Sequence, residues 1–152
     1  MNTAIVFASP HHGNTKKLLD AIASAFPEVT LIDAIRTPEP DLSGYDAVGF
    51  ASGIYYSKLH KSVLRVAQER LPQGVPVFFL YTCGMRRAGY TKAVADAAAA
   101  HGARVLGEYG ALGFNTYGPL RLVGGMGKGH PDSAETDGAV AFYRGVRDGL
   151  CV

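Results

Sequence analysis

The feature that most constrains this chain is the alternation of short apolar runs with longer stretches of helical periodicity. The first run, residues 3–8 (TAIVFA), is apolar on both faces of a strand, which predicts a position in the interior of a sheet. Similar runs follow at residues 29–32, 47–51, 75–81 and 104–112. Strands that alternate with helices are typical of β-α-β units around a parallel sheet.

Four helices are predicted between and after these strands. Apolar residues recur at a spacing close to 3.6 over residues 18–26, and a proline then ends the pattern. Two further helices are predicted over residues 58–70 and 90–101. A last helix begins at a Pro-Asp pair, where Asp132 and Glu135 have the spacing of a capping box, and continues almost to the end of the chain.

Length and composition indicate one globular domain, residues 1–152. The chain is 47% hydrophobic and 18% charged, which is too apolar for a disordered segment. Residues 37–44 and 115–129 are rich in proline or glycine and are predicted to be loops. Neither segment is long enough to separate two domains.

Charge and cysteine content exclude several classes of function. The net charge of +2 comes from 15 basic and 13 acidic residues without a long basic run, which argues against nucleic-acid binding. No apolar run approaches the ~18 residues needed to span a membrane, and the first residues do not resemble a signal peptide, so we expect a cytoplasmic protein. Cys83, Cys151 and five scattered histidines form neither a redox pair nor a metal site. Redox chemistry would therefore require a cofactor.

The loop at residues 9–15 (SPHHGNT) follows a buried strand and opens a helix. Backbone N–H groups at a helix start, together with the positive end of the helix dipole, form an anion site. The loop has no Lys where a nucleoside triphosphate loop needs one, so a phosphate monoester bound by neutral donors fits better. The same spacing also fits Ser9 and Asn14 acting only as capping and turn residues.

Two more loops follow strands and are rich in Gly, Ser, Thr or Tyr. They cover residues 52–57 and 82–89. Ligands of open parallel sheets bind beyond the carboxyl ends of the strands, where neighbouring connections leave in opposite directions. These two loops and the loop at residues 9–15 are therefore predicted to share one site.

The pattern Ser-x-x-x-Gly-Asn-Thr after the first strand resembles the FMN phosphate loop of flavodoxins. Its length, and the stretch GIYYSKLHKS at residues 53–62, are similar to the protoporphyrinogen-oxidase-type subgroup, and residues 128–131 (KGHP) again resemble the family. This resemblance implies an α/β flavodoxin-like fold, a doubly wound five-stranded parallel sheet in the order 2-1-3-4-5 with helices on both faces. It also implies FMN as the cofactor.

The resemblance further implies which residues contact FMN and that no side chain is catalytic. A flat apolar ring favours aromatic faces, with backbone amides near its polar edge. The residues that would hold the phosphate are Ser9, His11, His12, Gly13, Asn14 and Thr15. The residues that would flank the isoalloxazine ring are Ser52, Gly53, Ile54, Tyr55, Tyr56, Thr82, Cys83, Gly84 and Met85, with Arg86 as a further candidate.

The chain departs from the family pattern in three respects. It is slightly basic, it contains no Trp, and it lacks the long C-terminal insertion expected of a full protoporphyrinogen oxidase. Tyr55 or Tyr56 is the candidate for stacking on the flavin, and Tyr117 is a candidate lid residue. A half-buried aromatic at the rim of the site explains each of these tyrosines equally well.

These observations predict an FMN-binding electron-transfer protein or a small flavin-dependent oxidoreductase. A redox partner protein or a small-molecule electron acceptor would be its partner, and the chain would be a monomer or a homodimer. A quinone- or porphyrinogen-linked dehydrogenase is an alternative among flavoproteins. A cofactor-free binding or regulatory module on the same fold is the alternative from another class.

Overall fold

The computed structural model describes residues 1–10, 13–85, 87–112 and 131–150. Strands and helices alternate along the chain, as the apolar runs predict. The strands are β1 (Thr3–Ala8), β2 (Val29–Asp33), β3 (Ala47–Tyr55), β4 (Lys58–Leu59), β5 (Val77–Cys83) and β6 (Val105–Leu112). The helices are α1 (Asn14–Ala25), α2 (Lys61–Glu69), α3 (Lys92–Ala100) and α4 (Ser133–Leu150).

The main sheet is parallel and has the order β2-β1-β3-β5-β6. The short β4 lies outside this order and pairs antiparallel with the end of β3. Counting only the five parallel strands, the order is the predicted 2-1-3-4-5. The fold predicted from the sequence is therefore confirmed.

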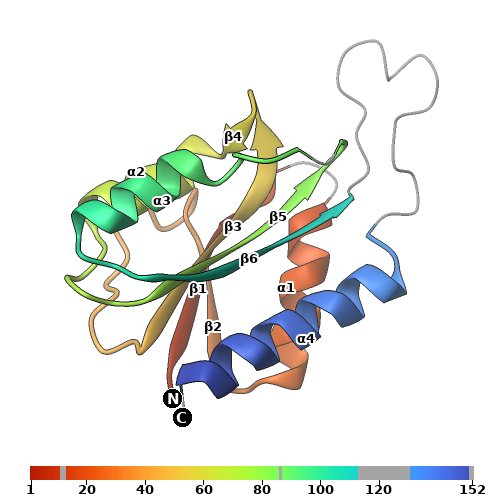
Figure 1. Cartoon of the computed structure of the whole chain (residues 1–152), viewed down its shortest axis with the longest axis horizontal. Coiled ribbons are helices and arrows are strands. Elements are labelled where there is room, and N and C mark those ends of the chain that lie inside the picture. Colours follow the sequence, from red (N-terminus) through yellow and green to blue (C-terminus); the bar gives the residue numbers. More distant parts are fainter. Residues whose placement is uncertain (11–12, 86, 113–130, 151–152) are drawn as a thin grey trace.

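Helices cover both faces of the sheet, as Figure 1 shows, with α2 and α3 on one face and α1 and α4 on the other. The fully buried β1 divides its side chains between the two cores because successive residues of a strand point to opposite faces. Val6 and its alternate neighbours pack with α2 and α3, whereas Ile5 and Phe7 pack with α1 and α4. This two-sided burial explains why residues 3–8 are apolar throughout.

The predicted boundaries around residue 55 were wrong. The third strand does not end at residue 51 but continues to Tyr55, and the helix predicted from Lys58 begins at Lys61 instead. The chain turns at Tyr56 and Ser57, which have φ of 52° and 64°, and returns as β4. Two successive residues with positive φ form the tight turn that best matches the twist of a hairpin, although Gly and Asn usually occupy it. Without a Gly or Asn there, the sequence carried no hairpin signal.

The predicted capping box at the start of α4 is confirmed. The Asp132 Oδ1 atom accepts the Glu135 N–H at 3.0 Å, and the Glu135 Oε1 atom accepts the Asp132 N–H at 3.4 Å. The second carboxylate oxygen of Glu135 accepts the Leu112 N–H at 2.6 Å. Glu135 therefore also joins the end of β6 to the start of α4. No helix in the described part of the chain is long and apolar enough to cross a membrane.

Candidate functional site

The candidate site lies at the carboxyl edge of the sheet, where β1, β3 and β5 end side by side. β1 leads to α1 on one face, while the neighbouring β3 leads to α2 on the other face. Neighbouring connections that leave in opposite directions open a crevice between them, which is the usual ligand site of such sheets. The structure thus brings the three predicted loops to one edge.

The start of α1 has the features of an anion site. Gly13 precedes the helix in the left-handed conformation, with φ of 64°, and as the N-cap residue it has no side chain to cap the helix. The first turn contains no acidic residue, so no carboxylate offsets the positive end of the helix dipole. The Ser9 hydroxyl lies over this turn and accepts the Lys16 N–H at 3.4 Å. Ser9 and Gly13 therefore both border the first turn of α1.

A buried hydroxyl pair joins the first loop to the third. The Thr15 and Thr82 Oγ1 atoms lie 2.9 Å apart, and the two residues are 1% and 4% exposed. Either hydroxyl can be the donor. When Thr82 donates, the Thr15 proton is available to another acceptor at the start of α1.

Ser52 has a structural role in the second loop. Its buried hydroxyl donates to the Gly53 carbonyl and accepts the His60 N–H at 2.9 Å. These bonds hold the β3–β4 hairpin and the start of α2 together. The neighbouring Gly53 is half-buried, and a Cβ atom there would lie 3.5 Å from the Tyr55 hydroxyl, an ordinary contact distance.

The two tyrosines of the hairpin differ in their surroundings. The half-buried Tyr55 packs edge-on against the His60 ring, with centroids 5.0 Å apart, and burial raises the pKa of the Tyr55 hydroxyl. Tyr56 at the tip of the turn is 91% exposed. His60 also begins α2, since its Nδ1 atom accepts the Ser62 N–H at 3.1 Å. Which of Tyr55 and Tyr56 stacks on a flavin stays a prediction.

Tyr90, which was not among the predicted site residues, holds the third loop in place. The Tyr90 hydroxyl donates to the Met85 carbonyl at 2.6 Å, and the Tyr90 ring packs against Tyr81. Cys83 is buried, and its thiol donates to the Ala111 carbonyl at 3.6 Å. The Met85 side chain, by contrast, is 53% exposed. The position of Tyr90, an aromatic residue at the end of a polar loop, was the one sequence feature that could have indicated this role.

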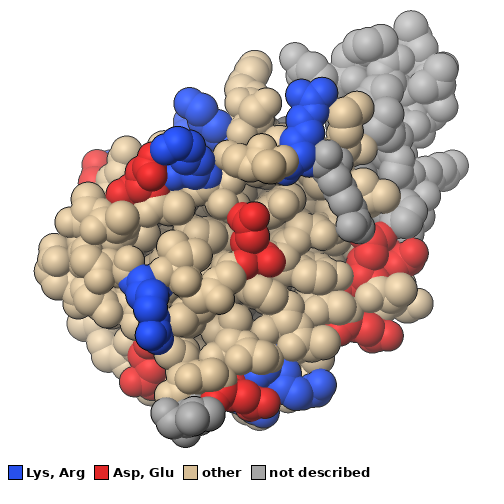
Figure 2. All heavy atoms as spheres, in the orientation of Figure 1, with Lys and Arg blue, Asp and Glu red and all other residues tan. Residues whose placement is uncertain are grey.

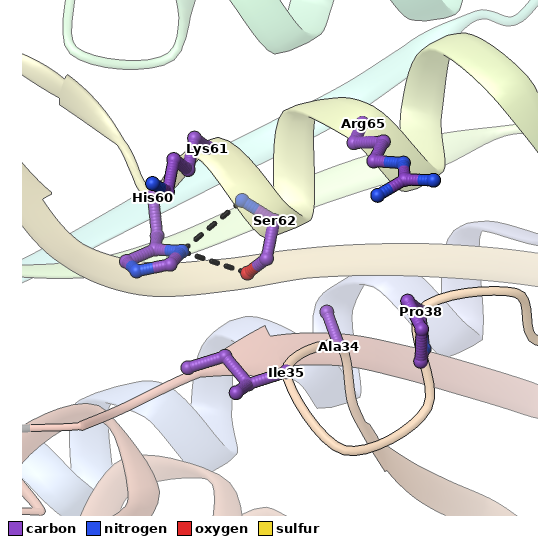
Figure 3. Close-up of a pocket in the computed structure, with 7 residues that line it drawn as sticks. All are labelled: Ala34, Ile35, Pro38, His60, Lys61, Ser62 and Arg65. Carbon is purple, nitrogen blue, oxygen red and sulfur yellow. Dashed lines mark hydrogen bonds between the residues drawn. The ribbon is translucent and has the colours of Figure 1, made fainter.

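A pocket of about 360 Å³ adjoins this edge, between α2 and the chain that follows β2. In Figure 3 the side chains of Ser62 and Arg65 project from α2 toward Ile35 and Pro38 on the opposite wall. His60 also lines the pocket, and its ring packs edge-on against Tyr55. The sequence did not predict this pocket, because its walls come from segments about 25 residues apart.

Some predicted residues fall outside the described part of the chain. They are His11, His12, Arg86 and the candidate lid residue Tyr117. Within the described ranges, no group of three or more His, Cys, Asp or Glu side chains could hold a metal ion.

Comparison with known proteins identifies the family. The family model described as a flavodoxin domain matches residues 4–101, which include the start of α1 and all three loops. The chain belongs to the flavodoxin family. This flavodoxin-family chain is 31% identical over 150 residues to an uncharacterized protein of Methanocaldococcus jannaschii, covering 96% of this chain and 98% of that protein.

Solved flavodoxins have the same fold as this flavodoxin-family chain. A flavodoxin from the domain Archaea has a TM-score of 0.63 at 14% identity, with 99% of both chains covered. Flavodoxin 2 from Bacillus cereus has a TM-score of 0.65 at 15% identity, covering 98% of this chain and 99% of that one. At sequence identities this low, the comparison shows a shared fold and nothing further.

Proposed function

We propose that this flavodoxin-family chain binds FMN at the carboxyl edge of its sheet and transfers electrons with it. The observation that carries the proposal is the start of α1, where Gly13 and a first turn without acidic residues leave N–H groups and a positive helix end at the β1–β3 crevice. The family to which the chain belongs supports the same assignment.

The FMN phosphate would lie over the first turn of α1. Ser9 and Gly13 border this position, and the Thr15 hydroxyl can donate into it when it accepts from Thr82. A phosphate dianion suits a site that offers neutral donors and a helix dipole and contains no carboxylate. Asn14, and His11 and His12 from the sequence prediction, complete the proposed set.

The isoalloxazine ring would lie between the second and third loops. Tyr55 and Tyr56 offer aromatic faces, while the backbone at Gly53 and Gly84 is accessible because neither residue is fully buried. The Ser52, Thr82 and Cys83 side chains use their polar groups within the protein, so these residues shape the ring site rather than contact it with free donors. Ile54 and Met85 add apolar contacts.

The protein would supply binding and orientation, and FMN supplies the electron-transfer chemistry when it is bound. No side chain needs to act as a nucleophile or general base. A redox partner protein or a small electron acceptor would complete the reaction. A quinone- or porphyrinogen-linked activity would in addition require a substrate pocket over the ring, and turnover of a quinone with a reductant would distinguish this activity from that of an electron shuttle.

Titration of the purified chain with FMN and with riboflavin tests the proposal. We expect FMN fluorescence to be quenched, and riboflavin to bind more weakly because it lacks the phosphate. Ser9→Ala should weaken FMN binding by about tenfold, the effect of one hydrogen bond to a charged group. Ser24→Ala, on the exposed side of α1, is the matched control and should leave binding unchanged.

Two results would contradict this function. A chain that quenches neither flavin would support the cofactor-free binding module instead. Equal affinity for FMN and riboflavin would show that no phosphate site exists at the start of α1.

A further inference from the structure

Three helices that start at the carboxyl edge carry lysine where the helix dipole favours an acidic residue. None of α1, α2 and α3 has an acidic residue in its first turn, whereas α4 has Glu135. Each of the three contains an i,i+4 ion pair with the basic partner nearer the N-terminus, the less favourable orientation. The pairs are Lys16–Asp20 at 2.6 Å, Arg65–Glu69 at 3.1 Å and Lys92–Asp96 at 2.7 Å.

Other cations at this edge are not neutralised. In the parts of the chain that the structure describes, no carboxylate lies within ion-pair distance of Lys58, Lys61 or Arg87. Asp33 ends β2 at the same edge, but it is paired with Arg36 at 3.8 Å. Figure 2 shows Lys and Arg along the upper margin of the molecule, over β4 and the starts of helices. The part of the edge formed by β4 and the starts of α2 and α3 is therefore electropositive, whereas the start of α4 carries Asp132 and Glu135.

Exposed apolar side chains lie among these cations. Five large apolar side chains are exposed in the described residues, and three of them, Ile35, Tyr56 and Met85, lie at the carboxyl edge, with exposures of 49%, 91% and 53%. Tyr56 is two residues from Lys58, and the Met85 sulfur lies 3.5 Å from the Arg87 guanidinium. Apolar anchors within a charged rim are typical of protein–protein interfaces.

These side chains belong to one continuous surface. Ile35 and Lys61 line the same pocket, β4 carries Lys58 directly into α2, and β4 also contacts α3. The loop with Met85 and Arg87 leads into α3. We name this surface the carboxyl-edge patch, and it consists of Ile35, Tyr56, Lys58, Lys61, Met85 and Arg87.

We propose that the carboxyl-edge patch docks an acidic redox partner protein, whose carboxylates surround an apolar centre. The inference rests on the proposed FMN function, because a partner that exchanges electrons must approach the edge where the ring would lie. Because the patch is basic, charge complementarity requires an acidic surface on the partner. The patch has its cations on several different turns, separated by apolar side chains, so it does not form the basic stripe that follows a nucleic-acid backbone.

Binding of two small redox proteins of opposite charge tests the proposal. Dye-labelled rubredoxin, which is acidic, and cytochrome c, which is basic, are titrated with the full chain, with and without FMN, and binding is followed by fluorescence anisotropy. The titrations are repeated at about 20 mM and about 300 mM salt, where the screening length differs severalfold. Heparin and vesicles containing anionic lipid serve as non-protein polyanions.

We expect rubredoxin to bind at low salt and to lose at least about tenfold in affinity at high salt, while cytochrome c does not bind. Lys61→Glu should weaken rubredoxin binding about threefold, and Lys58→Glu with Lys61→Glu about tenfold. Arg104→Glu is the matched charge reversal, at an exposed position before β6 at the opposite edge of the sheet, and should change nothing.

The proposal is overturned if rubredoxin does not bind at low salt, if cytochrome c binds as tightly, or if Lys61→Glu and Arg104→Glu have equal effects. Tighter binding of heparin or of vesicles than of rubredoxin also overturns it, in favour of a nucleic acid or a membrane. Docking is measured without FMN as well as with it. Loss of flavin binding would therefore refute the proposed function while the docking result still stands by itself.

Discussion

The Thr15–Thr82 hydroxyl pair gives the sharpest test of how the first loop would hold a phosphate. The two Oγ1 atoms are 2.9 Å apart and buried, and Thr15 lies in the first turn of α1. If Thr82 donates to Thr15, then Thr15 can donate to the phosphate, and Thr82 only orients it. Replacing each Thr by Val removes the hydroxyl and keeps the branched shape of the side chain.

The two substitutions should therefore differ in their effect on FMN affinity. A hydrogen bond to a charged group contributes about 1.5–3 kcal/mol, so Thr15→Val should raise the Kd for FMN by about 10- to 150-fold. Thr82→Val leaves the Thr15 hydroxyl in place and should raise this Kd by less than about fivefold. Each single variant should also lower the free energy of unfolding by about 1 kcal/mol, because a buried hydroxyl loses its partner.

Flavin fluorescence quenching measures both affinities, and urea denaturation of the flavin-free chain measures the stability. Riboflavin is the control ligand, since Thr15→Val should leave its Kd unchanged. The double variant has lost both hydroxyls, so no buried hydroxyl remains without a partner. Its loss of stability should therefore be smaller than the sum of the two single losses. Equal weakening of FMN and riboflavin by Thr15→Val, or equal effects of Thr15→Val and Thr82→Val on FMN, would refute the reasoning.

Three further predictions concern the scaffold. Gly49→Ala should lower the free energy of unfolding by about 1–3 kcal/mol, because its Cβ would lie 2.5 Å from a buried phenylalanine ring. Gly145→Ala has open space around it and should not destabilise the chain. Equal urea midpoints for the two variants would contradict this prediction. Burial raises the pKa of Tyr143 to about 12 from 10.0. The neutral Tyr143 hydroxyl therefore contributes fully to the stability of the folded chain below pH 10, and this contribution is lost as the pH rises through 12. This loss amounts to at most about 3 kcal/mol, and alkaline denaturation of Tyr143→Phe should lack it. Glu135→Ala should speed hydrogen exchange of the Leu112 amide, whose acceptor it removes, and an unchanged rate would show that this bond is not formed in solution.

The strand order and the faces of the sheet could be predicted because they follow from patterns that are local in sequence. A strand such as β1, apolar on both faces, must lie between two helical layers, and alternation with helices requires parallel neighbours. The capping box of α4 is likewise a three-residue pattern. The β3–β4 hairpin could not be predicted, since Tyr56 and Ser57 adopt positive φ without the residues that usually indicate it.

The site was predicted only as far as the positions of its loops. Residue types predicted Ser52 and Thr82 at the carboxyl ends of strands. Thr82 lies at the end of β5, whereas Ser52 lies within the longer β3, level with the end of β1. Their hydroxyl partners, however, are His60 and Thr15, which lie 8 and 67 residues away along the chain. Hydrogen bonds of this kind depend on tertiary packing, so no spacing in the sequence indicates that these hydroxyls already have partners.

Lys16, Lys61 and Lys92 lie in the first turns of α1, α2 and α3, and these cations connect the two proposals. Placing a cation at a helix start lowers helix stability by about 0.3–1 kcal/mol, so three such helices give up about 1–3 kcal/mol. A phosphate at the start of α1 would compensate for one of them, but it would not reach the starts of α2 and α3, which lie on the opposite face of the sheet. A second negatively charged partner at this edge would compensate for the other two. An acidic protein on the carboxyl-edge patch meets that requirement without competing with FMN for the start of α1.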